Sequence, residues 1–169
     1  MRFDQKKILV TGGSRGIGRA IATRFAAAGA QVAIHYGSNH EAADSAIKNL
    51  EGTGHILCSG DVAQPETTQR IVRETVEKLG GLDVLVNNAG IFEAHPVDDV
   101  TFDDWQLAWQ QTLAVNLTGP ANLCWQAIDH MRHNGGGRII NVSSRGAFRG
   151  EPRCPAYGAS KAGLNAMTQ

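Results

Sequence analysis

Short apolar runs alternate with longer helical stretches along the whole chain, and this alternation limits the possible folds more than any other feature. The runs that predict strands are Lys7–Val10, Gln31–Tyr36, His55–Cys58, Leu82–Val86 and Arg138–Val142. The stretches that predict helices are 16–28, 40–50, 65–79 and 102–133, with a further helix beginning near Tyr157. Alternation at this pitch is typical of a parallel sheet with helices on both faces, so we predict a doubly wound α/β fold. Because no repeat, linker or low-complexity tract interrupts the pattern, we expect one domain over residues 1–169.

The charge balance gives no reason to expect a polyanionic partner. The chain has 16 Lys and Arg residues against 16 Asp and Glu residues, which argues against nucleic acid or an anionic membrane as a partner. No apolar run reaches the ~18 residues that span a bilayer, and the first residues lack the apolar core of a signal peptide. Cys58, Cys124 and Cys154 have neither metal-ligand nor disulfide-framework spacing, so we expect no metal site. Together these features favour a cytoplasmic protein with reduced thiols.

A glycine-rich turn follows the first predicted strand and opens the first predicted helix. It covers Thr11-Gly12-Gly13-Ser14-Arg15-Gly16-Ile17-Gly18. Glycines at such a place let the backbone approach a pyrophosphate, whose charge is favoured by a helix N-terminus. The spacing is Gly-x-x-x-Gly-x-Gly rather than the common Gly-x-Gly-x-x-Gly fingerprint. A merely flexible turn is the alternative, but the strand-to-helix context favours a dinucleotide site.

The end of the second strand bears on which dinucleotide would bind. A carboxylate there would bind the adenosine ribose and repel a 2′-phosphate. The segment Ile34–Asn39 contains no acidic residue, and the first one is Glu41. Arg15 adds a guanidinium suited to a phosphate, although it could equally be a solvated surface charge. We therefore expect NADP, with NAD less favoured.

Tyr157 and Lys161 are four residues apart, a spacing that places both side chains on one face of a helix. A nearby ammonium favours the ionised form of a phenol, whose pKa is ordinarily near ~10. Such a pair suits a site where a carbonyl or alcohol oxygen exchanges a proton. Tyr-x-x-x-Lys also arises by chance, so the upstream motifs decide its meaning.

With these motifs assembled, the chain resembles the classical short-chain dehydrogenase/reductase family over nearly its whole length. Besides the glycine turn, Asp61-Val62 resembles the pair that contacts adenine, and Asn87-Asn88-Ala89-Gly90 is similar to a family signature. The resemblance implies a Rossmann-type fold that binds a nicotinamide dinucleotide. The cofactor-binding residues that it implies are Gly12, Ser14, Arg15, Gly16, Ile17, Gly18, Tyr36, Asp61, Val62, Asn88, Ala89, Gly90, Tyr157 and Lys161.

The resemblance also implies a catalytic tetrad of Asn116, Ser144, Tyr157 and Lys161. Ser144 is preferred to Ser143, because its separation from Tyr157 fits the family spacing. Tyr157 would exchange a proton with a carbonyl or secondary alcohol while a hydride moves between that substrate and NADP(H). In the implied mechanism Lys161 lowers the tyrosine pKa and binds the nicotinamide ribose. Ser144 would bond the substrate oxygen, and Asn116 would hold a relay water.

The sequence leaves the substrate itself open. Arg145, Arg149 and Arg153 lie in the segment 145–155, which should border the pocket. They could bind an anionic substrate, as in the 3-oxoacyl-carrier-protein reductases, the members of the family that the chain resembles most. Solvated loop charges are the simpler interpretation, and sugar, polyol or steroid-like alcohols are equally open.

The sequence stops at Gln169, shortly after Lys161. Members of the family continue with a sixth strand, a substrate-covering loop, another helix and a seventh strand. We therefore expect a chain truncated at its C-terminus, whose fifth strand is an uncovered sheet edge. A non-catalytic dinucleotide-binding fragment or sensor is the alternative function. We expect the full-length form to be a homodimer or homotetramer.

Overall fold

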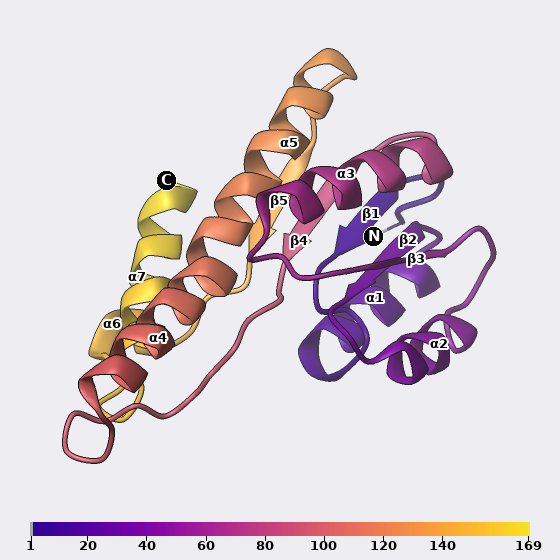
Figure 1. Cartoon of the computed structure of the whole chain (residues 1–169). Coiled ribbons are helices and arrows are strands. Elements are labelled where there is room, and N and C mark those ends of the chain that lie inside the picture. The colour runs from indigo at the N-terminus through magenta and orange to yellow at the C-terminus, as the bar shows by residue number, and fades with distance from the viewer. Residues whose placement is uncertain (1) are drawn as a thin grey trace.

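The computed structural model describes residues 2–169 and contains a five-stranded parallel sheet in the order β3-β2-β1-β4-β5 (Figure 1). The strands are β1 (Lys7–Val10), β2 (Gln31–Tyr36), β3 (Ile56–Ser59), β4 (Val84–Asn87) and β5 (Arg138–Asn141). Ile8 of β1 is opposite Val32 of β2 on one side and Val84 of β4 on the other. The chain adds β2 and β3 on one side of β1, and then adds β4 and β5 on the other side. This change of direction leaves a crevice at the carboxyl ends of β1 and β4.

Helices follow the strands and cover both faces of the sheet. They are α1 (Gly16–Ala27), α2 (His40–Lys48), α3 (Pro65–Leu79), α4 (Phe102–Leu113), α5 (Gly119–His133), α6 (Gly146–Arg149) and α7 (Pro155–Thr168), with a π-helical segment η1 (Ala114–Thr118) joining α4 to α5. In Figure 1, α4 and α5 form one long rod, and α7 lies beside its α4 half. None of the helices in residues 2–169 is long and apolar enough to cross a membrane.

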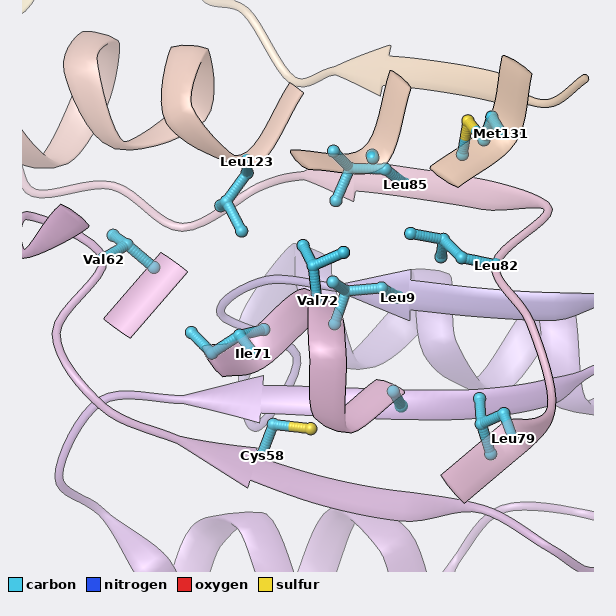
Figure 2. Packing of buried hydrophobic residues seen from close by; sticks show 12 residues of the cluster. Leu9, Cys58, Val62, Ile71, Val72, Leu79, Leu82, Leu85, Leu123 and Met131 are labelled. Atoms are coloured by element: carbon cyan, nitrogen blue, oxygen red, sulfur yellow. The ribbon is translucent and has the colours of Figure 1, made fainter. Parts of the chain in front are cut away.

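The side chains of each central strand divide between two cores. Ile8 and Val10 belong to the core beneath α1 and α2, whereas Leu9 belongs to the core beneath α3 and α5. All three are fully buried, as expected of a strand covered on both faces. Figure 2 shows the second core, where Leu9 and Leu85 of the sheet meet side chains from the two covering helices. The labelled helix residues are Ile71, Val72, Leu79, Leu123 and Met131.

The predicted doubly wound, Rossmann-type fold is confirmed. Within residues 2–169, β5 pairs with β4 alone, so it forms one edge of the sheet. Besides shifts of one or two residues in the bounds of several elements, two features differ from the prediction. The helix predicted over 102–133 is interrupted by η1, and the short helix α6 follows β5 where no helix was predicted.

Candidate active site

The glycine turn after β1 has the geometry of a phosphate-binding loop. Gly12 has a φ of 61°, a conformation that glycine adopts without steric cost. Gly18, in the first turn of α1, lies so close to the turn that a Cβ added there would clash with the Gly12 carbonyl oxygen. The first turn of α1 contains no acidic residue, and no side chain caps it. Its N-terminal end is therefore open to an anion.

Thr11 and Asn88 fasten this turn to the end of β4. The Thr11 hydroxyl oxygen accepts hydrogen bonds from the backbone amides of Asn88 and Ala89, each 3.0 Å long. The Asn88 side-chain nitrogen donates to the backbone oxygens of Thr11 at 2.9 Å and Gly12 at 3.2 Å. The Asn-Asn-Ala-Gly segment thus holds the glycine turn in place through hydrogen bonds from the end of β4.

His35, which the sequence analysis did not select, supports the same turn from β2. Its Nδ1 accepts a hydrogen bond from the Gly12 amide at 3.3 Å, and its Nε2 lies 2.9 Å from the Gly60 carbonyl oxygen. These partners assign a neutral ring with the proton on Nε2. Burial lowers the pKa of His35, which is 2% exposed, and the hydrogen bond to Gly60 only partly opposes this. Nothing in the pattern of β2 distinguishes this histidine from an ordinary core residue.

A cleft of about 690 Å³ opens above the turn, at the carboxyl ends of the central strands. The predicted cofactor residues that line it are Gly12, Ser14, Arg15, Gly16, Ile17, Gly18, Asp61, Val62, Asn88, Ala89 and Gly90. The lining residues that were not predicted are His35, Gly37, Ser38, Asn39, Gly60, Ile91 and Val115. Ser38 and Asn39 belong to the segment 34–39, whose lack of a carboxylate was noted in the sequence, but neither residue was predicted to bind the cofactor. The two lining sets together form one continuous surface.

Tyr36 does not line this cleft, so its predicted cofactor contact is not supported. Its ring is buried, and its hydroxyl is 2.6 Å from Nδ1 of His40, in the first turn of α2. Strand alternation explains the difference, because Tyr36 and His35 point to opposite faces of the sheet. His35, not Tyr36, is the β2 side chain that reaches the glycine turn.

Asn116 lies in η1, where the helix widens. It is fully buried, and its Oδ1 accepts from the Ile91 amide at 2.8 Å. Its Nδ2 donates to the Ile91 carbonyl at 2.9 Å and to the Ser160 hydroxyl at 3.3 Å. The side chain therefore links the loop after β4 to α7, and the wide turn brings it inward, as π-bulges often do at functional sites.

Lys161 and Tyr157 both lie on α7, and Lys161 adjoins the Gly90 end of the cleft. The Lys161 ammonium donates to the Val142 carbonyl at 2.8 Å and lies 5.9 Å from the centre of the Tyr157 ring. Burial lowers the pKa of this lysine. A Cβ added to the cleft residue Gly90 would be 3.9 Å from Lys161 Nζ and 3.2 Å from Asn116 Oδ1. The lysine and the asparagine thus adjoin the cleft without lining it.

The hydroxyl of Ser144 lies at the end of β5. Its Oγ accepts from the Gly146 amide at 3.2 Å, which leaves its proton to be donated elsewhere. Ser144 is half-buried, whereas the neighbouring Ser143 is exposed. Ser144 directly precedes the loop into α6, and α6 packs against α7. The four residues of the predicted tetrad therefore come from η1, the end of β5 and one helix, all at the same end of the sheet.

The comparisons with known proteins agree with this architecture. The short chain dehydrogenase family matches residues 6–169. A crystal structure of a short chain dehydrogenase from Burkholderia cenocepacia, in complex with NADP, superposes with a TM-score of 0.87 at 42% identity, covering 99% of this chain and 67% of that one. Versicolorin reductase 1 of Aspergillus parasiticus is 36% identical over 99% of this chain and 63% of its own length. Glucose 1-dehydrogenase of Gluconobacter oxydans is 38% identical over 95% of this chain and 60% of its own length.

The chain spans 58% to 65% of the length of four curated relatives that it matches. The fold, the glycine turn and the match over residues 6–169 nevertheless lead to one conclusion about ancestry. The chain belongs to the short chain dehydrogenase family of oxidoreductases.

Proposed function

We propose that this protein, in its full-length form, transfers a hydride between NADP(H) and a carbonyl or secondary alcohol, with Tyr157 as the acid or base. The observation that carries the proposal is the cleft that extends from the glycine turn to Gly90, beside the buried Lys161 ammonium. One end of this cleft suits a dinucleotide, and the other adjoins groups that can move a proton. We also propose that residues 1–169 form one dinucleotide-binding domain, because their strands share a single sheet.

The residues of the turn fit a dinucleotide. The open N-terminus of α1, together with Gly16, beside which an added Cβ would meet nothing within 4 Å, would accept the pyrophosphate. Asp61 and Val62 would contact the adenine, while Lys161 would reach the nicotinamide ribose with the protons that Val142 does not use. Bound there, the cofactor supplies or accepts the hydride.

Support for NADP over NAD comes from the β2 end of the cleft. Arg15, Ser38 and Asn39 line this end, and the segment from Ile34 to Asn39 contains no carboxylate. A guanidinium and a hydroxyl are suited to a 2′-phosphate, whereas a carboxylate would repel it. The related enzyme from Burkholderia cenocepacia was crystallised with NADP.

The roles of the proton-transfer residues follow from their contacts. Tyr157 would hold the proton that the substrate oxygen gains or loses, and the Lys161 ammonium lies 5.9 Å from the centre of its ring. Ser144 would donate its hydroxyl proton to the same oxygen as negative charge develops there. Asn116 would hold the loop after β4 against α7, because both hydrogens of its amide are engaged by Ile91 and Ser160.

The contacts of the loop arginines weaken the case for an anionic thioester. Arg145 lies 3.7 Å from the Glu151 carboxylate, and Arg153 lies 3.6 Å from that of Asp99. These carboxylates offset two of the three positive charges that had suggested a 3-oxoacyl substrate. Relatives of similar identity carry the names of a glucose dehydrogenase and a versicolorin reductase. We therefore place a neutral carbonyl or alcohol ahead of an acyl-carrier thioester.

We further propose that copies of the protein associate. Leu107, Trp125 and Ile128 are large apolar side chains exposed along the α4–α5 rod. Large apolar side chains exposed on one pair of joined helices favour a contact surface there. A homodimer formed through this rod agrees with the family resemblance.

The test is a turnover assay that follows the absorbance of reduced nicotinamide with a panel of ketones, sugars and acyl thioesters. We expect oxidation of NADPH with at least one neutral ketone, and titration of tryptophan fluorescence should show cofactor binding. Binding without turnover across the panel would favour the alternative, a non-catalytic dinucleotide-binding fragment. Absence of binding would reject both.

A further inference from the structure

We propose that His95 is a positioning residue for Tyr157: its imidazole caps the helix that carries the tyrosine and holds the loop after β4 against it. The proposal deepens the proposed function and rests on it where it concerns turnover. His95 lies outside every motif considered so far, and it is 1% exposed.

The start of α7 has an unmet need for a hydrogen-bond acceptor. Cys154 occupies the N-cap but contributes no side-chain hydrogen bond, and Pro155 at the first helical position has no amide hydrogen. The amides of Tyr157 and Gly158 both use the Cys154 carbonyl. The Ala156 amide is left over, and Ala156 is fully buried, so water cannot serve as its partner.

His95 supplies that acceptor from a different part of the chain. The Ala156 amide donates to Nε2 of His95 at 3.2 Å, and Nδ1 lies 2.9 Å from the Glu93 carbonyl oxygen. The Glu93 carbonyl can only accept and the Ala156 amide can only donate. The ring proton therefore lies on Nδ1, and Nε2 is the acceptor. A lone pair at a helix N-terminus is also the electrostatically favoured arrangement.

The same loop contacts α7 at further points on either side of His95. The Phe92 ring packs edge-to-face on the Tyr157 ring, with 4.7 Å between their centres. The His95 amide donates to the Arg153 carbonyl at 2.9 Å, and Arg153 lies 3.6 Å from Asp99. The capped residue directly precedes Tyr157 in the sequence. Movement of the cap would therefore shift the phenol and its aromatic neighbour together.

Two amide substitutions separate the contacts of the imidazole. His95→Gln places an amide oxygen where Nε2 lies, so it can still accept from Ala156. His95→Asn places its amide where Nδ1 lies, so it keeps the Glu93 contact and loses the cap. His133→Asn, at an exposed histidine that bonds only a carbonyl of its own helix, is the matched control.

The first measurements use NMR and hydrogen exchange on the chain itself, and they do not depend on activity. We expect a bare Nε2 in the wild type, a protected Ala156 amide, and a nuclear Overhauser effect between the Phe92 and Tyr157 rings. His95→Gln should keep the protection and the ring contact, whereas His95→Asn should lose both. A proton on Nε2, or equal protection in both variants, would overturn the proposal.

The second measurement is turnover with NADPH binding followed in parallel. His95→Asn should lower kcat about tenfold or more. The Kd for NADPH should stay close to that of the wild type, because no residue of the glycine turn takes part in the hydrogen bonds of His95. His95→Gln should restore kcat. Equal kcat in the folded Asn and Gln variants would overturn the positioning role. If the Asn variant does not fold, loss of kcat in a folded Gln variant would do so instead.

The two proposals fail differently. A wild type that never turns over contradicts the proposed function, and the exchange and ring-contact measurements still decide whether His95 caps α7.

Discussion

The two ends of the candidate site are built in different ways. The glycine turn rests on β1, β2 and β4, whose side chains are almost wholly buried, and Thr11, His35 and Asn88 fix its backbone. The proton-transfer end rests on β5, which pairs with one strand, and on α7. The cofactor end therefore depends on the centre of the fold, and the reactive end depends on its periphery. Each prediction below separates the two ends by a measurement that should change at one of them only.

The largest effect is expected from Tyr157→Phe, which removes the phenolic hydroxyl and keeps the ring that packs on Phe92. Loss of a general acid or base should lower kcat about a hundred- to ten-thousand-fold. The Kd for NADPH should remain unchanged, because the glycine turn is untouched. Steady-state kinetics and fluorescence titration measure the two quantities. Wild-type kcat in this variant would remove Tyr157 from the chemistry.

Substitutions in the two halves of the sheet should differ in their effect on stability. Leu85 is fully buried in β4, so Leu85→Ala should lower the free energy of unfolding by about 2–5 kcal/mol. Ile140 in the neighbouring β5 is 44% exposed, and Ile140→Ala should cost less than about 1 kcal/mol. Urea unfolding of the same preparation gives both values. Equal losses would show that β5 is as well packed as the centre of the sheet.

A pH effect on stability should arise at the cofactor end, from His35. Burial lowers the pKa of His35 in the folded chain, so the unfolded chain binds its proton more readily. Its contribution to stability is present above the ordinary histidine pKa near ~6.5 and is lost as the pH falls below that value. The slope should reach at most about 1.4 kcal/mol per pH unit. Urea midpoints between pH 5 and 7.5 measure it.

The control for this pH effect is His35→Asn, whose amide can still accept from Gly12 but does not titrate. The slope below the histidine pKa should flatten in the variant. An unchanged slope would assign the effect to other groups.

The smallest effect is expected at the rim of the cleft. Arg15→Ala should lower kcat/KM for NADPH about tenfold, because one charge-assisted hydrogen bond to an exposed phosphate is lost. The value for NADH should hardly change. Arg24→Ala, at the other end of α1 and outside this cleft, is the matched control. A parallel loss with both cofactors would show that Arg15 does not distinguish them.

The sequence predicted the cofactor end more completely than the reactive end. β1, β2 and α3 have the predicted bounds. Apolar runs mark the two strands, and Pro65 at the start and Gly80 at the end mark the helix. The motif residues of the glycine turn line the cleft together. Tyr36 lies outside the cleft lining, because a position at the end of a strand does not determine which neighbouring side chain faces the cleft, and its cofactor contact stays a prediction.

At the reactive end, the missed features all depend on contacts between distant segments. His95 meets α7 across 61 residues of sequence, and no local pattern reveals that pairing. The helix α6 is a single turn, too short for periodicity to show. The widened turn at Asn116 could not be predicted from the sequence either. The apolar residues continue on both sides of it, so the pattern resembles that of one uninterrupted helix. The roles of Asn116, Ser144, Tyr157 and Lys161 stay predictions.

The widened turn has one more consequence, for the long rod as a whole. Each residue of a helix advances the direction of its side chains by about 100°, so an extra residue changes the phase between the two halves of the rod. The α5 half can then direct Leu123, Ala127 and Met131 into the sheet, while the α4 half turns toward α7. Deleting one residue from 114–118 would restore a regular helix and put the two halves out of alignment with one or other neighbour. The rod can serve both neighbours because its halves follow separate angular registers.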